Sequence, residues 1–250
     1  MTGYNPSLKT LNDGTLVASS DARWNGGGDG GGLDTIASVS TDNGKTWNYS
    51  FPLYFPDSDG YIGNTATTII DPALVQGKDG EIYCIADVNP TGVTTMGGYK
   101  APGEGTGYVK VNGKDYLAVT DNYDNVNTQP KDDDATTYAY YVGDWDENGY
   151  AKILKRSDHS ETGYGVDKWY NLYKVENGEY KDTLTQKQVN SNTDIQQNIF
   201  YKGSALHVYN TGYMMYAKTY DDGFTWTDPE ILNPQIKRPT KETALLVSPG

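Results

Sequence analysis

The sequence predicts an all-β fold, and three observations carry this prediction. Turn signals recur at short spacing, the segments between them are short and rich in β-forming residues, and no sustained run of strong helix formers is present. The chain has 250 residues, including 22 Tyr and 29 Gly. That length can bury a sizeable core, either in one large β domain or in two smaller ones.

The turn signals are Asn-Gly and Asp-Gly pairs, whose residues tolerate the positive φ of tight hairpins. The pairs end at Gly14, Gly44, Gly80, Gly113, Gly149, Gly178 and Gly223. Strands are expected at residues 15–20, 35–40, 81–88, 116–120, 137–142 and 213–219. No segment has a convincing helical pattern, so antiparallel hairpins should dominate the fold.

One hairpin sequence occurs twice, at residues 40–47 and 219–226. Both copies have the form Ser/Thr-x-Asp-x-Gly-x-x-Trp. We expect the Asp carboxylate to accept turn N–H groups, the Gly to be left-handed and the Trp to pack beneath. Because its side chains hold the turn, the motif is interpreted as a fold element and not as a binding site. Repeated hairpins of one kind are typical of β-propellers, in which similar β units are arranged radially.

The two copies lie 179 positions apart (219 minus 40), or about four blades at roughly 45 residues per blade. Either the middle blades lack the motif, or a different unit is inserted between the copies. The middle favours an insertion, because it turns Tyr-rich and charged and has its own Asn-Gly hairpins. We predict first propeller blades at residues 1–96, an inserted β domain at 97–206, and a continued propeller at 207–250 that is incomplete at its C-terminus.

Composition limits the partners and cofactors. The net charge of −13 would repel nucleic-acid phosphates, and it also counts mildly against an anionic sugar unless arginines create a local positive site. Cys84, the only cysteine, lies in an apolar run and is predicted to be a buried strand residue. No apolar run approaches the roughly 20 residues that span a bilayer, and we expect no signal peptide before Gly3 in these residues. We expect no cofactor and no metal, and we interpret the acidic residues at 57–59 and 132–134 as solvated loops and not as calcium sites.

The repeated hairpins have the form of Asp boxes. They occur together with Asp21-Ala22-Arg23 and the glycine-flanked Asp29. This combination resembles the opening of a bacterial sialidase (neuraminidase) catalytic domain. The resemblance covers most of the chain, including residues 70–76 and 248–250, and the hairpin at 111–116 fits the subgroup with an inserted β domain. It implies the N-terminal blades of a six-bladed β-propeller.

The resemblance also implies an activity. The whole protein would be an exo-α-sialidase that hydrolyses terminal sialic acid from glycoconjugates, or transfers it intramolecularly. Its partners would be sialylated glycans or glycoproteins, and the parent protein would be secreted or located at the cell surface.

The resemblance assigns Asp29 as general acid and base. The glycines at 26–28 and 30–32 would free its loop to close over a sugar. A solvated turn aspartate is the alternative. The pocket for the N-acyl group is expected near Val93 and Met96.

Arg23 and Asp71 correspond to family residues that bind a ring hydroxyl, with Arg as donor and Asp as acceptor. The alternatives are a surface ion pair between Arg23 and Asp21, and a turn that Asp71 starts before Pro72.

The sequence departs from the family pattern at Tyr4, which stands where the first of three carboxylate-binding arginines is normal. Losing such a pair of charge-assisted bonds should cost on the order of a hundredfold or more. Either activity is impaired, the binding of the carboxylate is remodelled, or the alignment near Tyr4 is wrong.

The Glu, the other two arginines and the nucleophilic Tyr of the family belong to later blades. We therefore expect these 250 residues alone to be incomplete and inactive. Open strand edges should also make them marginally stable or self-associating.

Two other functions stay open. A catalytically degenerate sialoglycan-binding propeller protein would explain Tyr4, and it predicts binding without turnover. A structural or adhesive propeller without a sugar site is compatible with the acidic charge, and it predicts that Arg23, Asp29 and Asp71 do not converge in space.

Overall fold

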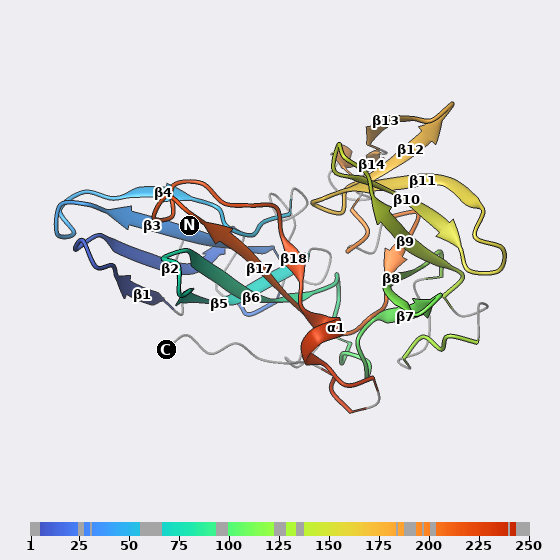
Figure 1. The fold of residues 1–250 in the computed structure, drawn as a ribbon, viewed down its shortest axis with the longest axis horizontal. Coiled ribbons are helices and arrows are strands. Elements are labelled where there is room, and N and C mark those ends of the chain that lie inside the picture. Colours follow the sequence, from blue (N-terminus) through green and yellow to red (C-terminus); the bar gives the residue numbers. More distant parts are fainter. Residues whose placement is uncertain are drawn as a thin grey trace.

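Figure 1 shows the fold in a computed structural model. The structure describes residues 6–24, 28–30, 32–55, 67–93, 100–122, 129–133, 138–183, 185–187, 194–196, 198–200, 204–239 and 241–243. The described strands form two eight-stranded sheets and one two-stranded hairpin, and neither large sheet closes on itself. The all-β prediction is confirmed.

The first sheet consists of two four-stranded antiparallel meanders (Figure 1). The first meander contains β1 (Ser7–Thr10), β2 (Leu16–Arg23), β3 (Leu33–Ser40) and β4 (Asn48–Ser50). The second contains β5 (Thr68–Gln76), β6 (Ile82–Asn89), β17 (Tyr213–Thr219) and β18 (Glu230–Ile231). The meanders are joined by the parallel pair of Leu33 with Thr68. Small antiparallel sheets of this kind are the repeating units of propellers.

The two repeated hairpins occupy equivalent places, since each connects the third and fourth strands of its meander. Oδ1 of Asp42 accepts the N–H of Thr46 at 2.8 Å, and Oδ1 of Asp221 accepts the N–H of Thr225 at 2.8 Å. The turn glycines are left-handed, with φ of 80° at Gly44 and 102° at Gly223. The hairpins therefore have the backbone geometry that the sequence predicts.

The tryptophans of the two hairpins differ in burial. Trp226 packs against an apolar cluster that draws on both meanders, and its indole N–H donates to Ser50 Oγ at 2.9 Å. Trp47 donates to its own Gly44 carbonyl at 3.0 Å and stays 43% exposed. The second hairpin thus also fastens the two meanders together.

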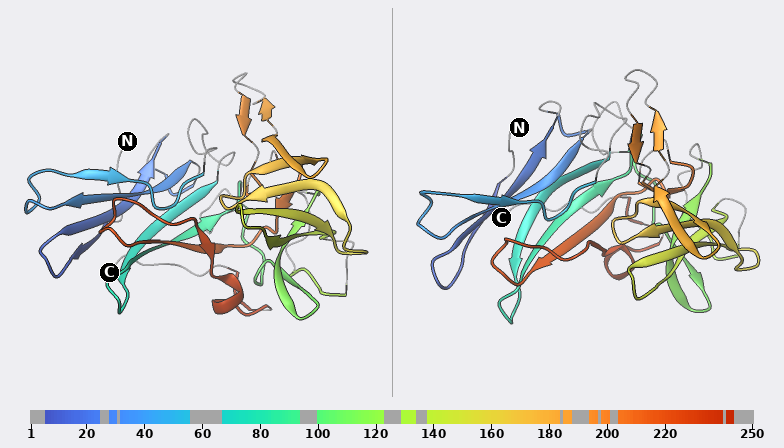
Figure 2. Two further views of the ribbon diagram at one scale, coloured as in Figure 1. Left: turned by 45° about the horizontal axis from the view of Figure 1, so that its top comes forward. Right: turned by 90° about the horizontal axis from the view of Figure 1, so that it is seen from above.

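The second large sheet lies between the second and third strands of the second meander in the chain. It contains β7 (Tyr108–Val111), β8 (Lys114–Thr120), β9 (Tyr140–Trp145), β10 (Tyr150–Lys155), β11 (Glu161–Asp167), β12 (Leu172–Glu176), β13 (Glu179–Thr183) and β16 (His207–Val208). The small hairpin pairs β14 (Thr185–Lys187) with β15 (Asp194–Gln196). Figure 2 shows the two large sheets side by side. The second sheet begins after the expected boundary at 96, and its last strand, β16, ends two residues after the expected boundary at 206. The division into domains itself stays a prediction.

One hydrophobic cluster draws on both sheets. It includes Ile69 and Met215 of the first sheet and Val119 and Ile153 of the second. The ring of Phe200 lies 5.2 Å from that of Phe55 and 5.1 Å from that of Tyr213. The two sheets therefore share a core and stabilise each other through it.

A single helical turn, α1 (Asn233–Ile236), departs from the expectation of no helix. Pro234 is its second residue, within the first turn, where the fixed φ of proline suits a helix and its missing N–H leaves no intrahelical bond unmade. Cys84 is buried on β6, as the sequence predicts. In the described parts of the chain no helix is long and apolar enough to cross a membrane.

Candidate active site

Arg23 is the last residue of β2, and its side chain is buried. Its Nη2 donates to Oδ2 of Asp21 at 2.7 Å, and its Nη1 donates to Oδ1 of Asp29 at 2.7 Å. Asp21 and Arg23 are two positions apart on one strand, so their side chains share a face. The guanidinium fork is thereby divided between a carboxylate of its own strand and one of the following loop.

Asp29 lies in the loop between β2 and β3. Its side chain is 43% exposed, whereas that of Asp21 is 0% exposed. At the base of the loop the N–H of Trp24 donates to the carbonyl of Gly32 at 3.3 Å. Asp29 is thus held by Arg23 on one side and faces solvent on the other, which suits a group that must meet a ligand.

Asp71 sits in a β-bulge of β5. Ile70 is paired with Asp87 and Ala73 with Ile85, so β5 carries one extra residue here. The φ of Asp71 is +58°, a conformation that costs a non-glycine residue about 1–3 kcal/mol and is frequent at functional sites. The structure therefore places Asp71 in a strand distortion, and the alternative of a turn before Pro72 is wrong.

Asp21 connects the three predicted site residues. Its Oδ1 accepts the backbone N–H of Asp71 at 2.9 Å, while its Oδ2 accepts Nη2 of Arg23. Asp29, Arg23, Asp21 and Asp71 consequently form one continuous set of contacts across two strands and a loop. Asp71 joins this set through its backbone N–H, so the convergence of the three side chains on one sugar site stays a prediction.

Asp21 has a larger part than the sequence suggested. The ion pair of Asp21 with Arg23 exists, but it is buried and not at the surface, because the strand carries both side chains inward. In the sequence, the signal for this contact is the spacing of two positions between Asp21 and Arg23, which places both side chains on one face of a strand.

The charges in this cluster affect each other. Burial raises the pKa of Asp21, against the lowering effect of the hydrogen bond from Arg23. Burial acts to lower the pKa of Arg23, but the bonds to Asp21 and Asp29 outweigh it and raise that pKa. With one guanidinium among three acidic side chains, the cluster suits proton transfer and hydroxyl binding better than binding of an anion.

Trp24 is a neighbour that the sequence did not single out. Its indole N–H donates to Oδ2 of the buried Asp34 at 2.7 Å, and Oδ1 of Asp34 accepts the N–H of Phe55 at 2.9 Å. The Trp24 ring also stacks on Phe51 at 5.8 Å. These contacts fix the base of the loop that carries Asp29.

Several predicted positions lie outside the described residues. They are Tyr4, Met96, the glycines at 26, 27 and 31, the acidic residues at 57–59, and Asp134. Val93 is buried and pairs with Lys100 in an isolated bridge. Among the described residues no group of three or more His, Cys, Asp or Glu side chains is placed to hold a metal ion.

The paired four-stranded meanders, with polar side chains gathered at strand ends, define the chain as part of a β-propeller protein. No family model matches the chain. The anhydrosialidase of Macrobdella decora is 30% identical over 276 residues, and sialidase B of Streptococcus pneumoniae is 27% identical over 270 residues. Among solved structures, the intramolecular trans-sialidase from Ruminococcus gnavus in complex with oseltamivir carboxylate is 31% identical, with a TM-score of 0.74.

The chain belongs to the sialidase family. Both curated alignments cover 98% of this chain, and the solved structure aligns with 93% of it. The sialidase neighbours are β-propellers, so the predicted class, a partial propeller, is confirmed. The chain spans 32% and 35% of the two curated relatives and 48% of the solved chain.

Proposed function

We propose that this chain forms part of an exo-α-sialidase that hydrolyses, or transfers intramolecularly, terminal sialic acid from glycoconjugates. The observation that carries the proposal is the contact of Arg23 with Asp29, because it places a solvent-facing carboxylate beside a buried cation at the end of a propeller strand. The names of the relatives, anhydrosialidase, sialidase and intramolecular trans-sialidase, support both outcomes.

Asp29 is the general acid and base in this proposal. As an acid it gives its proton to the glycosidic oxygen while the bond from that oxygen to the sugar breaks. As a base its carboxylate then takes a proton from the oxygen that forms the new bond to the anomeric carbon, which is a water oxygen in hydrolysis or a hydroxyl oxygen of the same sugar in intramolecular transfer. Each cycle returns Asp29 to its starting state.

Arg23 and Asp71 are proposed to bind a ring hydroxyl, as donor and acceptor. Arg23 would exchange its bond to the exposed Asp29 for one to the sugar and keep its bond to the buried Asp21. The strained bulge fixes Asp71 beside Asp21, so the hydroxyl site needs little rearrangement.

The chain does not complete the site in this proposal. A carboxylate substrate needs cationic partners that the cluster around Arg23 does not supply, and they would come from later blades of the whole protein. By themselves the 250 residues are expected to be inactive. The whole protein is proposed to be secreted or located at the cell surface, where sialylated glycoconjugates occur.

The test is hydrolysis of a fluorogenic sialoside by the full-length parent and its Asp29→Ala variant. The variant should lose about 10²- to 10⁴-fold in rate, the usual worth of a general acid–base. The matched control is Asp79→Ala, which removes an exposed aspartate of the β5–β6 turn and should leave the rate unchanged. Equal rates for the parent and Asp29→Ala would reject the role of Asp29. Mass spectrometry distinguishes the two outcomes, since the intramolecular product is one water lighter than free sialic acid.

A second candidate is a sialoglycan-binding protein that has lost catalysis, and Tyr4 in place of an expected arginine favours it. It predicts that the full-length parent binds a sialoside and releases no product. The same assay, combined with a binding measurement on the parent, separates the two functions.

A further inference from the structure

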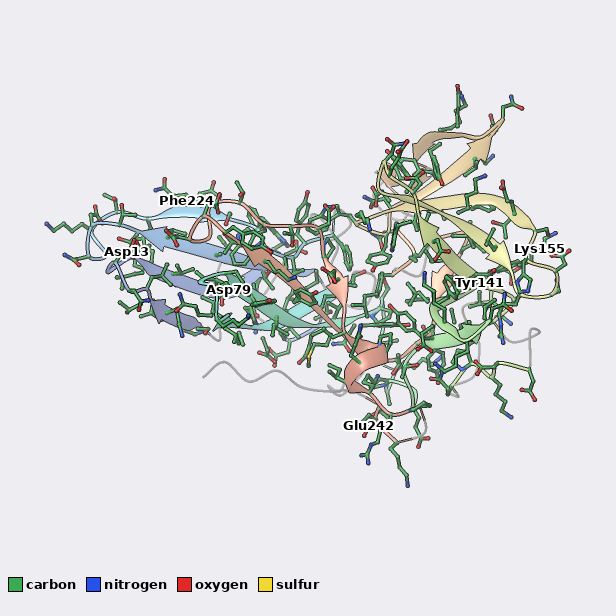
Figure 3. The ribbon with its side chains drawn as sticks, viewed as in Figure 1. Asp13, Asp79, Tyr141, Lys155, Phe224 and Glu242 are labelled. Carbon is green, nitrogen blue, oxygen red and sulfur yellow. The ribbon has the colours of Figure 1, made fainter. Side chains whose placement is uncertain are left out.

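The second sheet carries a cavity of about 460 Å³ that the proposed activity does not use. Its volume falls in the range of about 300–1,000 Å³ typical of ligand pockets. The lining side chains that matter here are Tyr108, Lys114, Tyr116, Asp144, Trp145 and Tyr170. In Figure 3 this region can be found through Tyr141, which lies on β9 with Asp144 and Trp145.

A β-bulge shapes the cavity wall. Trp145 pairs with Ala151 and Val142 pairs with Ile153, so β9 has one extra residue opposite Lys152. In a regular strand, neighbouring side chains point to opposite faces, yet Asp144 and Trp145 line the same cavity. The bulge redirects the strand, so that the carboxylate of Asp144 and the indole of Trp145 line the same cavity. Bulges beside binding sites often redirect side chains in this way.

The indole of Trp145 is fixed in place. Its ring meets Tyr170 edge-on at 6.1 Å, and Nζ of Lys168 lies 4.2 Å from the ring centroid. The residue remains 36% exposed. Lys168 covers one face of the ring, so it is the exposed part of the indole that offers a flat apolar surface to the C–H groups on one side of a sugar ring.

The carboxylate of Asp144 is fixed as well. Its Oδ1 accepts bonds from Nζ of Lys114 and, at 3.2 Å, from the hydroxyl of Tyr116. Chiefly the bond from Lys114 lowers the pKa of Asp144, so this group is ionised at neutral pH. Both bonds use one oxygen, so Oδ2 is placed to accept from the hydroxyls of a ligand.

The charge of the lining selects a neutral ligand. Lys114 is opposed by Asp115 and Asp144, and Asp115 is paired with Lys110 from beyond the lining at 2.7 Å. The protein also has a net charge of −13. Lys168 adds a positive charge beside Trp145 but lies outside the lining, and the two lining carboxylates favour the hydroxyls of a neutral sugar, because hydroxyls donate well to carboxylates.

We propose that this cavity binds one neutral pyranose unit of a glycan chain, stacked on Trp145 and hydrogen-bonded by Asp144. The site is separate from the Arg23 cluster and does not depend on the proposed activity. It would hold the neutral part of a glycan on the second sheet.

The experiment is a titration of the full-length parent protein with lactose, followed by ligand-observed NMR. We expect saturable binding in the millimolar range. Trp145→Ala should weaken it at least tenfold, and Asp144→Asn about fivefold, because a charged acceptor is replaced by a neutral one. Tyr49→Ala, which removes a 71% exposed aromatic from the first sheet, is the matched control and should keep full affinity.

Three outcomes would overturn the proposal: no saturable lactose signal in the wild type, equal affinity in the wild type and both cavity variants, or tighter Trp145-dependent binding of free sialic acid than of lactose. If Trp145→Ala does not fold, Asp144→Asn decides, since that side chain is 67% exposed and its loss leaves the core intact. Asp29→Ala should bind lactose normally, so failure of the proposed activity would not affect this result.

Discussion

Nη1 of Arg23 lies 2.7 Å from Oδ1 of Asp29, while the same guanidinium donates to the fully buried Asp21. One cation therefore serves two carboxylates of opposite exposure. The buried carboxylate holds Arg23 in position, and the exposed one can exchange its bond for one to a ligand. Neutralising the buried carboxylate should therefore lower the free energy of unfolding more than neutralising the exposed one.

Asp21→Asn should lower the free energy of unfolding by about 3 kcal/mol, because it leaves a buried cation without its buried partner. Asp29→Asn should cost less than about 1 kcal/mol, since an exposed ion pair contributes little. Urea unfolding of the wild type and both variants measures the difference. Equal costs for the two variants would show that burial does not separate the roles of Asp21 and Asp29.

The turn glycines of the two repeated hairpins form a second matched pair. Both have positive φ, so alanine should cost about 1–2 kcal/mol at each position. At Gly223 an added Cβ would also lie 3.0 Å from Val39 and 3.3 Å from Val17, whereas at Gly44 the nearest atom is 3.7 Å away.

Gly223→Ala should therefore be less stable than Gly44→Ala by about a further 1–3 kcal/mol, the usual cost of overpacking. The free energies of unfolding in urea are compared for the two variants. If Gly44→Ala were the more destabilised protein, the docking of the second hairpin on the first meander would be in doubt.

Lys237 gives a pH-dependent prediction. It is buried, and its Nζ donates to Thr211 Oγ1 at 2.8 Å and to the Gly212 carbonyl at 2.7 Å. Burial lowers the pKa of Lys237 to about 8 in the folded protein, from a usual value of 10.5. Below pH 8 both the folded and the unfolded chain carry this proton, so its contribution is constant.

Between pH 8 and 10.5 the unfolded chain binds more protons at this position, so stability rises with pH. Relative to Lys237→Met, which cannot titrate, the wild type should gain up to about 3 kcal/mol over this interval. Urea unfolding of both proteins at several pH values measures the gain. Parallel curves would mean that the pKa of Lys237 is close to its usual value when the protein is folded.

The sequence by itself determined the local features of this protein. Residues 213–219, predicted as a strand, are β17, and the two motif hairpins have the expected turns. Asp29 and Arg23, which the family resemblance and not the local pattern assigns to one site, are in contact. Such features were readable because turn chemistry and side-chain alternation depend on neighbouring residues.

Only the tertiary structure decided burial and long-range contact. Asp21 accepts the N–H of Asp71, 50 positions later, and nothing local distinguished that aspartate from a surface one. The bulge at Asp71 and the one that brings Asp144 and Trp145 to a single cavity depend on how each strand pairs with its neighbour. The physical reason is that a charge changes its role when distant strands remove it from water, and the pairing of distant strands is not encoded in any short segment.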